Sequence, residues 1–459
     1  MAGISLLFLI MPCIFGSLYL SHAETDTLKQ GQQLHDWEQL ISAEGVFRLG
    51  FFSLDSNSVV FGSFAPRYIG IWFDRIPIYP VWVANPKNPI PDSSGVLTVD
   101  SDDMLKIAYR GQPPMAISSN NQATKIFSNS NVTATLLDSG NLVLREVGVD
   151  GITGPVLWQS FDYPSNMLLP EMKLGMNLKT GHEWYLSSWL SDKVPSPGAF
   201  KLGLDPDGSE QLIIWRRGEV YWKSGVWGNG SFQLAPMLTT RVDEYEFRFD
   251  TNENESYFSY SVKNRSATVS RWELETLGQI TQFTLERRNN SDTWIFETTG
   301  KCETDLHNQT AVCLSEKPSK CRNGSELFEP KKGYMNSPGY NDNNASLALS
   351  DCHAKCWQNC FCVAYKSSSY NGTGCVFWTR ESEFIPDQAY EEFYLLTLQH
   401  SVVLLQEIIL RIQACGALIS HVSGPLVLTE HARNLSIRKA CLELIDKSLD
   451  SPVRKMKYY

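Results

Sequence analysis

Cysteine is distributed very unevenly along this chain of 459 residues. Of its 11 cysteines, eight lie within residues 302–375, while residues 14–301 contain none. Crowding of this kind predicts a small module held together by disulfides in an oxidising compartment. Closely spaced cysteines also bind zinc in cytosolic proteins, so a metal site is the alternative. The eight are Cys302, Cys313, Cys321, Cys352, Cys356, Cys360, Cys362 and Cys375.

The first residues of the chain predict an export signal. Residues 4–20 are apolar and end at Ser21-His22-Ala23, which places small residues at the two positions that signal peptidase reads. Pro12 interrupts the run, which is short for a membrane span, and a buried strand is the other alternative. We therefore expect a signal peptide over residues 1–23 and an extracellular chain. Export favours disulfides over zinc, so neither a metal nor another cofactor is expected.

Nine Asn-X-Ser/Thr triplets lie downstream of this signal. One such triplet is weak evidence, but nine in an exported chain predict a glycoprotein and mark loops that should face solvent. The nine asparagines are Asn131, Asn229, Asn254, Asn264, Asn289, Asn308, Asn323, Asn344 and Asn371.

Composition and length narrow the class of fold. The 13 Trp, 22 Phe and 18 Tyr, together with 31 Gly and 22 Pro, favour strands and turns over helices. A chain of this length exceeds one hydrophobic core, so about two to four domains are expected. The net charge of −10 argues against nucleic acid as a partner. We therefore expect a mainly β protein of several domains.

Short aromatic segments with alternating polarity mark the first strands. Residues 46–52, 68–73 and 81–86 have this character, and the turn cluster at 91–95 follows them. Alternation buries one face of each strand, so the Trp side chains of this region are expected in the core rather than on a sugar-binding surface.

A distinctive stretch closes this region, at residues 158–169, with the sequence Trp-Gln-Ser-Phe-Asp-Tyr-Pro-Ser-Asn-Met-Leu-Leu. It resembles the segment that ends the bulb-type lectin region of plant S-domain receptor-like kinases and S-locus glycoproteins. The resemblance implies a bulb-type lectin β-prism over residues 24–156, in which antiparallel sheets wrap a Trp-rich core around a pseudo-threefold axis.

Bulb-type lectins bind mannose through Gln, Asp, Asn, Val and Tyr at alternate positions of one strand. In the nearest match here, Asn141 and Val143 are kept, whereas Leu137, Ser139 and Arg145 replace the other three. A second match keeps only Asp102. Because most of the hydrogen-bonding groups are missing, the resemblance in fold does not by itself imply mannose binding.

The next segment, residues 157–301, resembles the S-locus glycoprotein part of the same family. The matching stretches are residues 187–189, 195–200, 221–227 and 271–273, and residues 204–208 supply a hairpin turn. They imply a second β-rich domain.

Residues 302–398 contain the spacing Cys352-X3-Cys356-X3-Cys360-X-Cys362, with Cys375 further on. This spacing resembles the PAN/apple module. We expect a helix over residues 346–358 with Ser350 as its N-cap, and a strand that carries Phe361 between two cysteines.

The resemblance also implies the disulfides Cys352–Cys375 and Cys356–Cys362. The pairing of Cys302, Cys313, Cys321 and Cys360 stays open, because the EGF-like segment usual in the family is shortened here and eight cysteines allow about 105 pairings.

The last residues, 399–459, resemble no complete domain. Residues 402–422 are apolar, but four polar or charged residues interrupt them, so a membrane span is not evident. Residues 430–435 and 442–449 resemble a late helix of a protein kinase C-lobe. No Gly-rich phosphate loop, catalytic-loop Asp or Asp-Phe-Gly motif is present. We expect a loosely ordered tail and no enzyme activity.

Together these features predict a secreted or cell-surface recognition ectodomain. By analogy with the family it would serve pollen recognition or immune sensing, binding an extracellular protein, peptide or glycan, alone or as a homo- or heterodimer with related receptors. The alternatives are a mannose-binding lectin and a fragment of an active receptor serine/threonine kinase.

Overall fold

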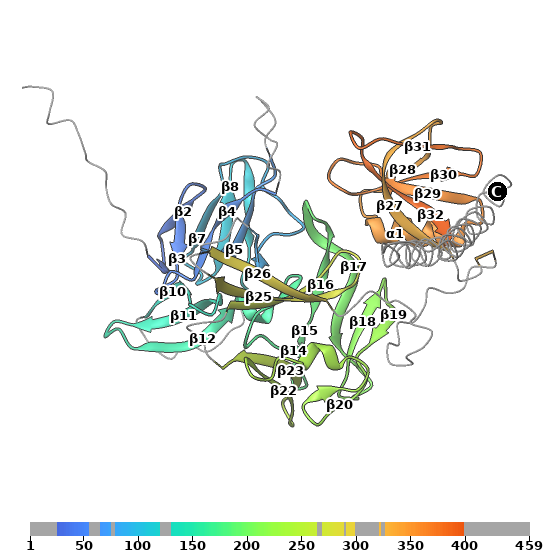
Figure 1. Cartoon of the computed structure of the whole chain (residues 1–459). Helices are drawn as coiled ribbons and strands as arrows, with labels where there is room; N and C mark the ends of the chain where they lie inside the picture. Colours follow the sequence, from blue (N-terminus) through green and yellow to red (C-terminus); the bar gives the residue numbers. More distant parts are fainter. Residues whose placement is uncertain are drawn as a thin grey trace, which may run out of the picture. The chain divides into compact units, whose positions relative to one another are not determined.

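The computed structural model describes residues 25–54, 65–74, 79–119, 130–263, 269–288, 291–298, 321–322 and 326–398. The chain divides into two compact units, Met1–Cys313 and Leu314–Tyr459. Strands dominate both units (Figure 1), so the expected mainly β class is confirmed. The predicted signal peptide and the tail over 399–459 lie outside the described residues.

Strands β1–β12 form three four-stranded antiparallel sheets, which we call the first prism. Each sheet adds one short strand from the start of the chain to a meander of three consecutive strands, so β1, β2 and β3 lie in three different sheets. Burial alternates along β7, as expected for a strand with one face on a core. The three sheets are β1 (Thr27–Lys29), β10 (Ser130–Leu136), β11 (Leu142–Gly148) and β12 (Thr153–Gln159); β2 (Gln33–His35), β7 (Val96–Val99), β8 (Leu105–Tyr109) and β9 (Gln112–Ala116); and β3 (Gln39–Ile41), β4 (Phe47–Phe52), β5 (Tyr68–Phe73) and β6 (Trp82–Val83).

Strands β13–β19 and β22–β26 form three further four-stranded antiparallel sheets, which we call the second prism, and in one of them the short β13 again joins three consecutive strands, β24–β26. Distant segments pair here: β13 lies beside β24, with Leu168 opposite Trp272. The sheets are β13 (Met167–Leu168), β24 (Val269–Leu274), β25 (Ile280–Arg288) and β26 (Ser291–Thr298); β15 (Glu183–Trp184), β14 (Leu174–Asn177), β23 (Glu255–Val262) and β22 (Tyr245–Thr251); and β16 (Leu186–Ser191), β17 (Val194–Leu204), β18 (Leu212–Arg216) and β19 (Glu219–Lys223). Hairpin β20 (Trp227–Gly228)–β21 (Ser231–Phe232) and the 3-10 turns η1 (Ser160–Asp162) and η2 (Pro236–Thr239) complete the described elements of this unit.

One hydrophobic core runs through both prisms. A single cluster of buried side chains contains Trp82 and Trp158 as well as Trp272. The rings of Trp82 and Trp158 meet edge to face with centroids 6.0 Å apart. Trp189 of the second prism belongs to a smaller cluster with Trp72 of the first. The expectation that the Trp side chains of the first region are core residues is confirmed for Trp72 and Trp82, and Trp158, which follows that region, is buried as well.

One tryptophan of the first prism departs from that expectation. Trp37 is 76% exposed, and its ring stacks on His35 at a centroid distance of 4.9 Å. It follows β2 in a turn, where alternation gives no information about burial.

The second unit contains a six-stranded antiparallel sheet and the helix α1 (Leu349–Gln358). The sheet order is β28 (Tyr340–Asp342), β30 (Cys375–Thr379), β29 (Cys362–Ser367), β32 (Glu392–Leu398), β27 (Glu326–Met335) and β31 (Phe384–Pro386). Within the residues that the structure describes, no helix has the length and apolar character needed to cross a bilayer.

Two predictions about the helix region are wrong. The helix begins at Leu349, with Ala348 as its N-cap, and Ser350 lies inside its first turn. The Asp351 carboxylate accepts a 2.9 Å hydrogen bond from the Ala348 N–H, which caps the end without a side-chain hydroxyl. Phe361 is in a turn and 72% exposed, because β29 begins only at Cys362.

Candidate functional site

The strand that resembles the mannose motif lies in the first prism, at the start of β11. A tight turn precedes it, in which the Gly140 N–H donates to the Leu137 carbonyl at 2.9 Å. Gly140 has a φ of +83°, and a Cβ there would lie 2.9 Å from Phe47, so the turn needs glycine. The side chains of this motif are therefore held rigidly by the turn and the core beneath it.

Asn141 has its amide engaged within the protein. Its Nδ2 donates to Gln159 Oε1 at 3.0 Å, and its Oδ1 accepts from the Ser160 hydroxyl at 3.2 Å and the Phe161 N–H at 3.3 Å. The residue is 8% exposed. These hydrogen bonds hold the end of β12 and the following turn η1 next to the start of β11. The Asn141 side chain therefore stabilises the fold.

The other motif residues also lack the arrangement of a sugar site. Val143 is buried, so it offers no surface to a ligand. Asp138, the carboxylate next to Ser139 in the sequence, accepts a 2.8 Å hydrogen bond from the Glu44 N–H. Asp102 lies in the turn between β7 and β8, which belong to a different sheet from β11, and its carboxylate is 3.7 Å from the Lys106 ammonium. The structure thus does not bring Asp102 and Asn141 together.

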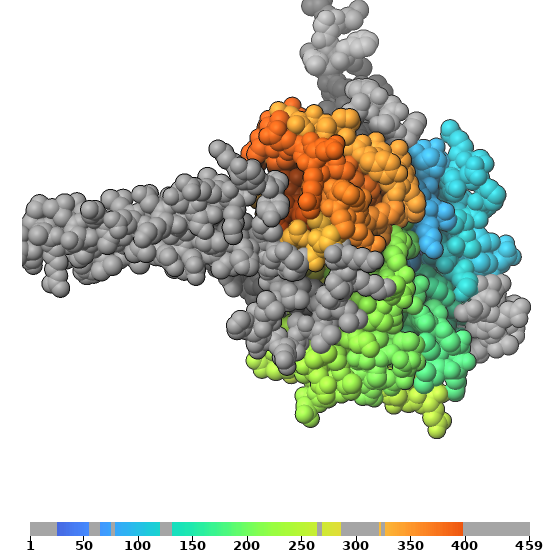
Figure 2. Space-filling model, turned by 90° about the vertical axis from the view of Figure 1, so that its right-hand side faces the viewer, coloured from blue at the N-terminus to red at the C-terminus, as the bar shows by residue number. Residues whose placement is uncertain are grey.

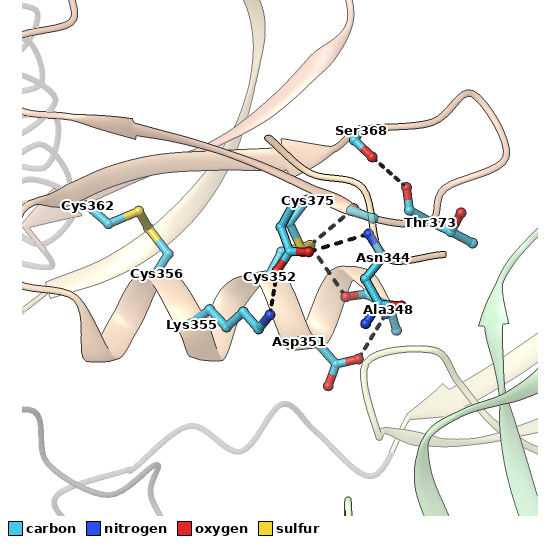
Figure 3. Close-up of a disulfide and its surroundings, with 12 residues drawn as sticks. Asn344, Ala348, Asp351, Cys352, Lys355, Cys356, Cys362, Ser368, Thr373 and Cys375 are labelled. Carbon is cyan, nitrogen blue, oxygen red and sulfur yellow. Dashed lines mark hydrogen bonds and ion pairs between the residues drawn. A yellow bond between two sulfur atoms is a disulfide. The ribbon is translucent and has the colours of Figure 1, made fainter. Parts of the chain in front are cut away.

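The cysteine-rich unit contains three disulfides among its described residues. Cys352–Cys375 joins α1 to β30 and Cys356–Cys362 joins α1 to the start of β29, the pairs that the family resemblance implies (Figure 3). The third, Cys321–Cys360, joins two of the four cysteines whose pairing the family resemblance does not imply. Cys302 and Cys313 lie outside the described residues. Together the bridges fix the helix against the sheet.

Arg322 supports the other end of this helix and was missed from the sequence. Its guanidinium donates to the carbonyls of Cys356, Asn359 and Cys362 at 3.2, 3.1 and 2.7 Å. A cation at a helix C-terminus satisfies carbonyls that have no partner in the helix and matches its dipole. The only sequence signal is its position directly after Cys321.

The described glycosylation triplets lie largely at the surface. Asn131, Asn229, Asn254 and Asn344 are exposed, and Asn371 is half-buried. Asn371 Oδ1 accepts a 2.8 Å hydrogen bond from the Thr373 hydroxyl of its own triplet. The remaining four predicted sites, Asn264, Asn289, Asn308 and Asn323, lie outside the described residues.

The two prisms meet at a buried polar group that the sequence did not predict. Glu273 accepts from the Tyr79 hydroxyl at 2.5 Å and from Asn166 Nδ2 at 3.3 Å. The Arg271 guanidinium lies 4.7 Å from the centre of the Tyr79 ring. Burial raises the pKa of the Glu273 carboxyl and lowers the pKa of Arg271.

Within the described residues no cluster of three or more metal-ligating side chains occurs here or elsewhere.

Comparison with known families divides the chain into three matched regions. Residues 80–190 match the D-mannose binding lectin family, 222–332 the S-locus glycoprotein domain and 321–383 the PAN-like domain. The lectin match extends past β12 into the second prism, in line with the core shared by the two prisms.

Relatives from Arabidopsis thaliana cover most of the chain. The G-type lectin S-receptor-like serine/threonine-protein kinase CES101 is 35% identical over 408 residues, which are 80% of this chain and 46% of the relative. A second kinase of the same description is 35% identical over 384 residues, which are 82% of this chain and 43% of the relative. This chain thus spans less than half the length of these two relatives.

Among solved structures, the Japanese Marasmius oreades lectin covers 30% of this chain and 90% of its own, with 14% identity and a TM-score of 0.20. That similarity is too low to bear on the fold. The three matched families together lie within residues 80–383 of this chain, and the two receptor-kinase relatives cover 80% and 82% of it. Over about 80% of its length, the chain is therefore similar to G-type lectin S-receptor-like serine/threonine kinases, and it contains stretches that match the D-mannose binding lectin, S-locus glycoprotein and PAN-like families.

Proposed function

We propose that this chain is a secreted or cell-surface recognition ectodomain that binds an extracellular protein, peptide or glycan. The observation that carries the proposal is the succession of lectin, S-locus glycoprotein and PAN-like matches in a chain homologous to receptor kinases. Exposed glycosylation triplets in the prisms and three disulfides in the PAN-like unit support an extracellular setting.

The proposed role is binding and not phosphoryl transfer. The matched families are a lectin, an S-locus glycoprotein domain and a PAN-like domain, and the kinase activity named for the relatives is not carried over to these residues. Pollen recognition and immune sensing are the roles that the family suggests. We propose that these residues act by binding the ligand, alone or in a homo- or heterodimer with related receptors.

Mannose binding is the second candidate, and the match to the D-mannose binding lectin family favours it. The contacts of Asn141 and the burial of Val143 count against a site on β11. A sugar bound there would have to compete with hydrogen bonds that the protein already makes. We therefore propose that this strand serves as scaffold.

The proposal is tested by expressing the tagged chain in plant cells. Surface or apoplastic recovery is expected, with glycans on Asn131, Asn229 and Asn254 and with the Cys352–Cys375 bridge, as read by mass spectrometry of non-reduced peptides. Asn131→Gln serves as a control, because it should remove one glycan and leave delivery unchanged. An unglycosylated intracellular chain with free thiols would contradict the proposal.

A further inference from the structure

The second prism has a hollow of about 470 Å³ on the outside of the sheet β16–β19, where this sheet meets β14 and β15. Its volume falls in the range of roughly 300–1,000 Å³ typical of small-molecule sites. The side chains of Tyr185 and Trp215 line it, and Tyr185 is 40% exposed. The second prism is the green to yellow part of Figure 2. No residue of the mannose-like strand in the first prism lines the hollow.

Gly203 lies between these two aromatic side chains. A Cβ at this position would lie 3.4 Å from the Trp215 ring and 3.5 Å from Tyr185 Cβ, which are ordinary contacts, and the backbone of Gly203 is not left-handed. Neither conformation nor crowding therefore requires glycine in this strand, where glycine weakens the sheet. A strand glycine of this kind often marks the close approach of a ligand.

The charges around the hollow favour an anion. Lys201 and Arg217 line it together with one carboxylate, Glu183, in a chain whose net charge is −10. The Lys201 ammonium lies 4.2 Å from the centre of the Tyr185 ring and 5.7 Å from that of Trp215. The ammonium thus lies over both rings and is closer to Tyr185.

The present partner of Lys201 can be replaced at little cost. The Lys201 ammonium is 2.5 Å from Glu183, and both side chains are about two-fifths exposed. An ion pair so open to water contributes little net stability. An incoming carboxylate could therefore share or take over the ammonium.

We propose that this hollow binds an acidic sugar residue of an oligosaccharide, with its ring against Tyr185 and Trp215 and its carboxylate on Lys201. The flat C–H face of a pyranose matches an aromatic ring, and its hydroxyls can bond to the Ser187 hydroxyl and the Glu183 carboxylate at the rim. A linear acidic peptide would use Lys201 but leave the aromatic walls uncovered. The inference rests on the proposed recognition function and gives it a site and a ligand class.

Titration calorimetry of the secreted whole chain with trigalacturonic acid tests the proposal. We expect saturable binding that Lys201→Gln weakens by about tenfold and that methyl esterification of the sugar weakens similarly. Lys173→Gln is the matched control, because Lys173 also pairs with a carboxylate at 2.5 Å and lies over two aromatic rings, yet does not line the hollow. It should leave the affinity unchanged.

Two glycine variants distinguish a loss of ligand space in the hollow from a loss of folding. Gly203→Ala should weaken binding about fivefold without lowering the melting temperature, because the added methyl group occupies ligand space. Gly228→Ala, in β20 and with no atom within 4 Å of the added Cβ, should change neither property.

Three results would overturn the proposal. The methyl ester could bind with the same affinity as trigalacturonic acid, or Lys201→Gln and Lys173→Gln could lower the affinity equally. Triglutamate could also bind as tightly as the acidic sugar. Absence of binding in a surface-delivered, glycosylated chain would also refute it. That last result would leave the recognition function standing, since delivery and glycosylation are read out separately.

Discussion

The Tyr79 hydroxyl of the first prism donates a 2.5 Å hydrogen bond to the Glu273 carboxylate of the second. Burial, followed by the interactions with Glu273, raises the pKa of Tyr79, and burial raises the pKa of Glu273 above its ordinary value of 4.5. Burial thus disfavours the charged form of both groups at this contact between the prisms.

Glu273 should make the stability of the first unit depend on pH. The folded state binds its proton more tightly than the unfolded state, so this contribution is fully present below pH 4.5 and is lost as pH rises through the raised pKa of the folded protein. Raising the pH should lower the unfolding free energy of the wild type more than that of Glu273→Gln. Denaturant titrations at a series of pH values measure this difference, and parallel profiles would contradict it.

Trp189 should couple the two prisms energetically. It is 3% exposed and packs with Phe52, Tyr68 and Trp72 of the first prism. Trp189→Ala should lower the unfolding free energy by about 3–5 kcal/mol, because it leaves a cavity between the prisms. The control Trp37→Ala removes an exposed ring and should change it by less than about 0.5 kcal/mol. Equal effects in thermal unfolding would argue against a shared core.

The bridge between α1 and β30 should stabilise the second unit alone. Replacing Cys352 and Cys375 by serine removes a disulfide that closes a loop of 23 residues and should cost about 2–5 kcal/mol. Hydrogen exchange read by mass spectrometry should show faster exchange in 326–398 and no change in the prisms. Faster exchange in the prisms as well would contradict independent units.

Asn141 should matter for stability rather than for sugar affinity. Asn141→Ala removes the donor to Gln159 Oε1 and the acceptor of the Phe161 N–H, which should cost about 1–3 kcal/mol. Asp102→Ala, at a side chain that is 70% exposed, should cost less than about 0.5 kcal/mol. Chemical denaturation of the two variants provides the comparison, and equal costs would remove the case for a structural Asn141.

Local patterns in the sequence predicted local structure well. The strand expected over 68–73 is β5, and the turn expected over 204–208 lies between β17 and β18. The segment expected over 81–86 is shorter, since β6 covers only Trp82–Val83 before Pro86. These features depend on neighbouring residues, which is why alternation and turn chemistry reveal them.

Non-local features could not be read from the sequence. The second prism depends on pairings such as β13 with β24, about a hundred residues apart, and no local pattern encodes such a register. The N-cap was misplaced because serine is a favoured cap, whereas Asp351 bonds to the N–H of Ala348. Asn141 matches the mannose motif in sequence, but its amide forms hydrogen bonds with residues of β12 and η1 instead. Those contacts cannot be read from the motif.

The most direct test of this account is a mannose-glycan array probed with the secreted chain, alongside Asn141→Ala and Asp102→Ala. We expect no mannose signal from a disulfide-intact, folded protein, because the first prism then serves as scaffold for recognition elsewhere. Mannose binding by the wild type that either variant abolishes while remaining folded would contradict it and would place a lectin site on the strand or turn of that residue.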